Sequence, residues 1–144
     1  MKTKIFIWCI LLFSLYGCLQ QQGISKAIVG RVIDGDTIVL GTEEKVRLIG
    51  IDTPERGEEC FEEGKIRMQQ LTEGKEISMI KDISETDKYG RLLRYIYVGN
   101  DFINLIMIQE GYAHAYKYEP DVKYANIFKI AELSADKNGC LWRN

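Results

Sequence analysis

The sequence predicts an α+β domain, mainly β: a small closed barrel of five strands with about three helices packed on it. The chain has 144 residues, of which 46% are hydrophobic and 28% charged, a normal balance for one globular domain. Five short segments rich in β-branched residues alternate with segments of helical spacing within roughly 120 residues. This number of strands and helices in so short a domain favours an OB-fold.

The first three strands are predicted to form a meander. Residues Ala27–Ile33 and Thr37–Leu40 are short and β-branched, and Asp34-Gly35-Asp36 between them is a strong hairpin signal. Thr42-Glu43-Glu44 supplies a second turn, after which Lys45–Ile51 is predicted as the third strand.

Pro54 ends the meander because it lacks an amide donor and disfavours helix at the residue before it. A helix is expected from Glu59 to Thr72, with Gly74 as its terminator. The later elements expected are strands at 77–82 and 92–98, a helix at 103–110, and a last helix carrying Ala125, Phe128, Ala131 and Ala135 and closed by Gly139.

The first 17 residues are typical of a signal peptide rather than of the domain. Lys2 and Lys4 precede an apolar run, 5–16, that is short for a membrane span. The sequence before Cys18 resembles the lipobox of lipoproteins, which would lipidate that thiol after cleavage. An uncleaved N-terminal anchor is the alternative. Residues 18–26 are then a tether and 27–144 the domain, exported and either held on the membrane facing outward or secreted.

The remaining cysteines also fit an exported protein. Cys60 and Cys140 lie far apart in sequence and could close a long loop as a disulfide in an oxidising compartment. Two free buried thiols are the alternative. Because the sequence has no C-x-x-C pair and no Cys/His cluster, a zinc site is not expected.

The net negative charge disfavours a surface that attracts nucleic acid over its whole area. The full chain carries −2, and removal of Lys2 and Lys4, the only charged residues in 1–17, leaves −4. Any affinity for phosphates must therefore come from a local basic cluster or from a bound cation.

Two carboxylates and an arginine suggest such a local site. Asp36 and Asp52 lie at the ends of neighbouring meander strands, where they can converge on one hard cation such as calcium or magnesium. Arg47, in the third strand, suits bidentate phosphate recognition or, alternatively, an ion pair with a nearby carboxylate. Taken singly, the segments around these residues also fit a turn, a helix start and a solvated loop.

Three motifs in order resemble the staphylococcal nuclease (thermonuclease) family: D-G-D-T at 34–37, R-x-x-x-x-D-T-P-E at 47–55, and D-K-Y-G-R at 87–91. The resemblance covers Val29 to Trp142. It implies calcium-dependent hydrolysis of DNA and RNA to products with 3′-phosphate ends. Single strands are the expected preferred substrate, and the protein is expected to be a monomer.

The resemblance also implies a role for each matching residue. The calcium ligands are Asp36, Asp52 and the carbonyl of Thr53. The catalytic residues are Arg47 and Arg91, which bind the scissile phosphate, and Glu55, which activates the attacking water. The residues expected to line the nucleotide pocket are Lys88, Tyr89, Tyr116 and Tyr118.

Two observations leave other interpretations open. The segment 56–58 is short, which indicates that a loop reaching over the substrate is trimmed, and the acidic charge differs from the basic members of the family. A catalytically inert OB-type module that binds nucleic acid or protein is the alternative function, and a purely structural surface lipoprotein is a third. His114 is expected to be a packed or surface histidine because no partner residue is near it in sequence.

Overall fold

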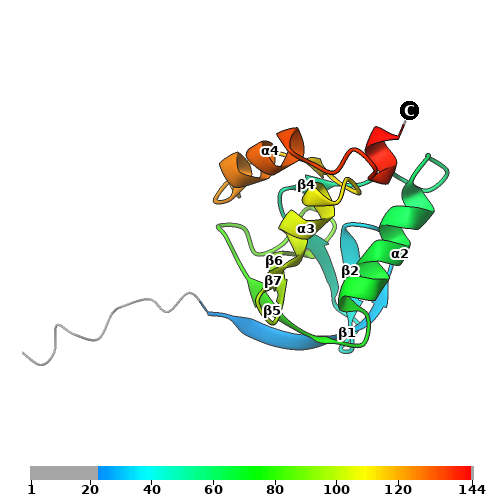
Figure 1. The fold of residues 1–144 in the computed structure, drawn as a ribbon. Coiled ribbons are helices and arrows are strands. Elements are labelled where there is room, and N and C mark those ends of the chain that lie inside the picture. Colours follow the sequence, from blue (N-terminus) through cyan, green and yellow to red (C-terminus); the bar gives the residue numbers. More distant parts are fainter. Residues whose placement is uncertain (1–22, 144) are drawn as a thin grey trace, which may run out of the picture.

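The computed structural model of the chain describes residues 23–143, so the predicted signal peptide, the lipidation site Cys18 and residues 18–22 of the tether lie outside the described residues. Five strands form a closed barrel (Figure 1). These strands are β1 (Ser25–Val32), β2 (Thr37–Leu40), β3 (Lys45–Leu48), β5 (Glu76–Ile80) and β6 (Leu92–Val98). The predicted OB-type barrel is confirmed.

The barrel closes through a pairing between residues distant in sequence. Strands β1, β2 and β3 form the expected antiparallel meander, and β1 also pairs with β5, which pairs with β6. Strand β6 then pairs in parallel with β3, with Val46 opposite Leu92, so that the sheet has no open edge along this side. The short β7 (Asp101–Phe102) pairs antiparallel with the end of β6.

Three helices pack on the barrel, as predicted. Helix α2 (Phe61–Thr72) contacts β1, α3 (Ile103–Gln109) contacts β6, and α4 (Ala125–Leu133) packs on α3 and on β8 (His114–Ala115). Figure 1 shows α2 on one side of the barrel and α3 with α4 at another. No helix within residues 23–143 is long and apolar enough to cross a membrane.

The core lies inside the barrel and under the helices. Tyr95 and Phe128 are among its largest fully buried side chains, and their rings pack edge to face with centroids 6.2 Å apart. The other members with the least exposure come from strands and helices alike: Ile38, Val46, Leu48, Ile51, Met68, Ile77, Ile96, Ile103, Met107 and Ile108.

Three predicted elements differ from the structure. The third strand does not run unbroken to Ile51, because Gly50 turns the chain at φ 79° and a separate strand, β4 (Ile51–Asp52), pairs with β8. The last helix ends at Leu133 rather than near Gly139, and a 3-10 turn, η1 (Cys140–Trp142), follows it. The first strand also begins at Ser25, inside the predicted tether.

Candidate functional site

Asp36 connects the first hairpin to the segment after β4. Its Oδ2 accepts hydrogen bonds from the backbone amide and the hydroxyl of Thr53, at 3.0 and 2.9 Å, and its Oδ1 accepts one from the Thr37 hydroxyl at 3.0 Å. The hairpin itself is held by the Asp34 carboxylate, which accepts the Asp36 amide at 3.1 Å. Asp36 is only 6% exposed, so its carboxylate has a fixed position.

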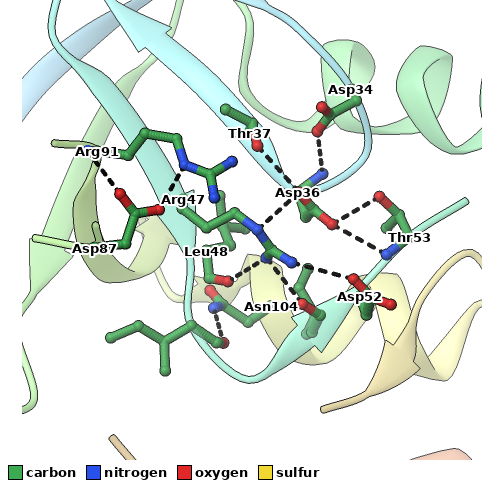
Figure 2. A network of polar contacts seen from close by, with 12 residues as sticks. Asp34, Asp36, Thr37, Arg47, Leu48, Asp52, Thr53, Asp87, Arg91 and Asn104 are labelled. Carbon is green, nitrogen blue, oxygen red and sulfur yellow. Dashed lines mark hydrogen bonds and ion pairs between the residues drawn. The ribbon is translucent and has the colours of Figure 1, made fainter. Parts of the chain in front are cut away.

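The Arg47 guanidinium bridges the two predicted metal carboxylates (Figure 2). Its Nε lies 3.1 Å from Asp36 Oδ1 and its Nη2 lies 3.3 Å from Asp52 Oδ1. Its Nη1 donates to the carbonyls of Leu48 and Ile51 at 2.7 and 2.8 Å, which fixes the side chain against the turn between β3 and β4. Of the two sequence-based alternatives for Arg47, the ion pair is present in the structure, and binding of a phosphate stays a prediction.

Negative charge is crowded at this point of the barrel. Burial, together with the charge of Asp36, raises the pKa of Asp34 to about 6. Burial also raises the pKa of Asp52, and Asp36 adds to this rise while Arg47 opposes it. A nearby cation would stabilise the charged forms of these crowded carboxylates.

The donor set suits a hard divalent cation. Asp36 is buried and fixed, and Asp52 is exposed. One carboxylate oxygen of each residue contacts the guanidinium of Arg47. Among residues 23–143 no three His, Cys, Asp or Glu side chains converge on a common point. The ligands that the family resemblance assigns to a cation here are Asp36, Asp52 and the carbonyl of Thr53, an oxygen-only set of the kind that binds calcium.

A pocket of about 280 Å³ lies beside Arg47 and gathers six of the residues assigned to phosphate or nucleotide binding. Backbone and side chains of the β3–β4 segment, with Leu93, form its apolar part. The six residues are Arg47, Lys88, Tyr89, Arg91, Tyr116 and Tyr118. Basic groups and aromatic rings thus share one cavity, the combination that binds the phosphates and bases of nucleic acids.

The tyrosines of this pocket are exposed although most aromatic residues of the domain belong to the core. Tyr89 is 72% exposed, and Tyr116 and Tyr118 are 50% and 36% exposed with ring centroids 6.3 Å apart. Lys88 Nζ lies 5.0 Å from the centre of the Tyr89 ring. These rings are available to a planar ligand.

Asp87 orients Arg91, a role that the sequence did not indicate. Its Oδ1 accepts the amides of Tyr89 and Arg91 at 2.9 and 3.0 Å, and its Oδ2 accepts Arg91 Nε at 2.6 Å. Burial alone would raise the pKa of Asp87, but these donors from Arg91 and Tyr89 hold that pKa below its usual value. The only signal in the sequence is the aspartate four residues before the arginine in the D-K-Y-G-R motif.

The turn at Gly50 and the β4–β8 pairing bring the tyrosines to the pocket. The carbonyl of Gly50 accepts the Tyr116 amide at 2.9 Å, and the fully buried Asn104 donates to the Ile49 carbonyl at 2.8 Å. Asn104 also accepts the Ile96 amide at 2.9 Å, so it fastens the turn to β6. Sequence reasoning missed Asn104, although an asparagine within an apolar helical segment is a signal of a buried polar contact.

Glu55 is placed apart from the pocket lining. It lies in the short loop after β4, exposed, and its backbone amide donates to the Glu58 carboxylate at 2.7 Å. The same loop ends at Cys60, whose sulfur is bonded to that of Cys140 at 2.08 Å. The loop is therefore fixed at one end by Thr53 and at the other by a disulfide.

His114 has partners that its sequence neighbourhood did not show. It pairs with Asp52 across β4 and β8, and its Nδ1 lies 3.1 Å from the Glu132 carboxylate. Its ring packs edge to face on Trp142, with centroids 5.3 Å apart.

Comparison with known proteins gives one family and several relatives. The family model described as staphylococcal nuclease homologue matches residues 45–144. A thermonuclease of Staphylococcus intermedius is 38% identical over 76% of this chain and 71% of its own length. A thermonuclease of Staphylococcus hyicus is 34% identical over 89% and 85% of the two chains, and a micrococcal nuclease of Shigella flexneri is 33% identical over 79% and 71%.

Proposed function

The chain belongs to the staphylococcal nuclease family, and from this we propose that it is a calcium-dependent nuclease that hydrolyses DNA and RNA to products with 3′-phosphate ends. The observation that carries the proposal is the pocket in which Arg47 and Arg91 lie together with Lys88 and exposed tyrosines, next to the Asp36 and Asp52 carboxylates.

Substrate binding follows from the chemistry of the pocket. A phosphodiester carries one negative charge, and the guanidinium groups of Arg47 and Arg91 can each donate two parallel hydrogen bonds to its oxygens. Bases can stack on the rings of Tyr89, Tyr116 and Tyr118, and this stacking does not depend on the identity of the base. This chemistry suits single strands of either nucleic acid, because their bases are free to stack.

The reaction is an attack of water on phosphorus. The water oxygen bonds to phosphorus, Glu55 accepts the proton that the water loses, and the bond to the 5′ oxygen breaks. The leaving oxygen takes up a proton from solvent, so that one product ends in a 5′-hydroxyl and the other in a 3′-phosphate. Arg47 and Arg91 stabilise the charge that grows on the remaining phosphate oxygens.

Calcium, held by Asp36, Asp52 and the Thr53 carbonyl, would supply neutralisation of the phosphate charge as a Lewis acid. Asp36, which would be one of the ligands of the cation, also contacts Arg47 Nε at 3.1 Å, so the cation site and the phosphate-binding arginine share one carboxylate.

We also propose that the enzyme acts outside the cytoplasm, as a monomer. The signal-like sequence of 1–17 and Cys18 support export and a lipid anchor, and secretion without an anchor is the alternative. The disulfide between Cys60 and Cys140 agrees with an oxidising compartment.

Conservative substitutions test the assignment of catalytic residues. We expect Glu55→Gln to lower kcat by about 10²–10⁴-fold, because the variant cannot accept the proton of the water. We expect Arg91→Lys to lower kcat by roughly 10²–10³-fold, because an ammonium cannot reproduce the bidentate contact.

The matched controls are two exposed residues that do not line the pocket. Glu44→Gln in the β2–β3 turn and Arg31→Lys, whose Nη1 lies 2.9 Å from Glu43, make the same chemical changes outside the pocket. Wild-type rates in both test variants would contradict the assignment. If the wild-type protein binds a single-stranded oligonucleotide but does not cleave it, the result would support the alternative of an inert binding module.

A further inference from the structure

A second hollow of about 280 Å³ adjoins the pocket and is not used by the proposed mechanism. It lies between β8, the segment that follows β8, and the first turns of α4. Tyr116 lines both the pocket and this hollow, so the two cavities meet at one exposed ring. The remaining lining residues are Ala115, Lys117, Ala125, Asn126, Phe128 and Lys129.

The hollow has an apolar floor and a polar rim. Ala115, Ala125 and the buried ring of Phe128, which is 1% exposed, form the floor. The exposed residues Lys117, Asn126 and Lys129 form the rim. A flat apolar surface beside ammonium and amide groups is complementary to a nucleotide, in which an aromatic base is attached to an anionic phosphate.

Carboxylates already contact both lysines, to different degrees. Lys129 Nζ lies 2.8 Å from Glu132, which is 12% exposed and is also held by the Ala115 amide and by His114, so this pair is fixed. Lys117 Nζ lies 2.7 Å from Glu119, with 67% and 66% of the two side chains exposed. An ion pair between two exposed side chains stabilises little because water solvates both charges, so Lys117 can exchange its carboxylate for a phosphate.

We propose that the second hollow is a subsite for the nucleotide next to the one bound in the pocket, on the side away from the scissile bond, so that a dinucleotide cleaved at the pocket does not reach it. The proposal rests on the proposed function, because it takes the pocket to hold the nucleotide at the scissile bond. The Tyr116 ring, 50% exposed and with its amide bound to the Gly50 carbonyl, then lies between two successive bases of the strand. Lys117 contacts the phosphate beyond it, and Asn126 contacts the base edge or the sugar.

The subsite implies that longer substrates bind more tightly because they reach Lys117 and Asn126. Two single variants, Lys117→Gln and Asn126→Ala, are compared with wild type on a dinucleotide phosphodiester and on a single-stranded oligonucleotide of about ten nucleotides. We expect each variant to raise KM for the oligonucleotide about 3–10-fold, with kcat unchanged, and to leave kcat/KM for the dinucleotide unchanged.

The control is Lys26→Gln. Lys26 Nζ lies 2.9 Å from Glu76 with 63% and 58% of the side chains exposed, so the variant removes the same charge and the same kind of ion pair, on β1 and β5. Because Asn126→Ala changes no charge, its effect separates a local contact from a general loss of attraction for nucleic acid.

Three results would overturn the subsite: variants equal to wild type on both substrates, equal losses on the dinucleotide and the oligonucleotide, or an equal loss in Lys26→Gln. Failure of the proposed function is detected separately, because wild type would then cleave neither substrate. In that case fluorescence anisotropy with the same labelled oligonucleotides replaces KM by Kd. The subsite predicts the same length-dependent weakening of Kd, and its absence rejects the subsite.

Discussion

Arg91 enters the pocket in an orientation set by one carboxylate. Asp87 is 7% exposed at its side chain and accepts three hydrogen bonds, of which two come from Arg91. An unrestrained arginine loses rotamer entropy each time it binds a phosphate. Fixing the guanidinium before the substrate arrives reduces this loss and holds the two arginines at a constant separation.

Asp87→Asn should therefore lower kcat by about 10-fold or more while the fold stays intact. The asparagine amide group would face Arg91 Nε with a donor in place of an acceptor, so Arg91 would leave its present position. The measurement is a comparison of kcat, KM and the thermal midpoint with those of Asp101→Asn, an exposed aspartate on β7. A variant with wild-type kcat, or one that loses only stability, would show that Asp87 is not a positioning residue.

At the scale of elements, the turn between β3 and β4 decides the shape of the site. Gly50 has φ 79°, and a Cβ at this position would lie 2.5 Å from a ring carbon of Phe128. The turn directs Asp52 away from the barrel sheet and into the β4–β8 pair. Without this change of direction, Asp52 would continue the register of β3 and would not pair with His114.

Gly50→Ala should destabilise the protein by about 2–5 kcal/mol, from the left-handed backbone and the overlap with Phe128 together. Gly57→Ala is the matched control, because its φ is 93° but no atom lies within 4 Å of the added Cβ. The control should lose only about 1–2 kcal/mol. Urea unfolding of both variants measures the difference, and equal losses would mean that the Phe128 contact is not restrictive.

Local patterns were sufficient to predict the elements but not their long-range pairing. The hairpin at Asp34-Gly35-Asp36, the five barrel strands and the three helices all have signals within a few residues, and the structure has them. The parallel β3–β6 closure, the β4–β8 pair and the Asn104 contacts join residues far apart in sequence. Such contacts depend on the packed fold, and no periodicity of a single segment encodes them.

The same distinction applies to the site. The family resemblance assigned the arginines, the carboxylates, Lys88 and the tyrosines, and the structure places six of these residues in one pocket. Asp87 and the hollow beyond Tyr116 were not foreseen, because each depends on how a side chain lies in three dimensions.

For the whole molecule, the disulfide joins two segments that are 80 residues apart. It links the start of α2 to η1, so that the loop carrying Glu55 and the C-terminal turn are held together. In the chain-entropy view, a closed loop of this length restricts the unfolded chain and contributes about 4–5 kcal/mol at most.

We expect Cys60→Ala/Cys140→Ala to lose about 2–5 kcal/mol of unfolding free energy in urea. The exported wild-type chain, unfolded without reductant, should show neither of these two thiols in a thiol titration. When both proteins are measured in reductant, the double variant should have the same free energy of unfolding as wild type. Free thiols at both positions in the exported protein would contradict the disulfide.

The overall charge of −2 makes the affinity for nucleic acid a property of the pocket and of its cation rather than of the whole surface. The most direct measurement is therefore incubation of the purified protein with single-stranded DNA, first with calcium, then with excess chelator, and then with calcium restored. Glu55→Gln serves as the inactive control. We expect degradation of the DNA to 3′-phosphate ends with calcium, loss of this activity with chelator, and its recovery when calcium is restored. Binding without cleavage in any divalent cation, or cleavage that persists in chelator, would contradict it.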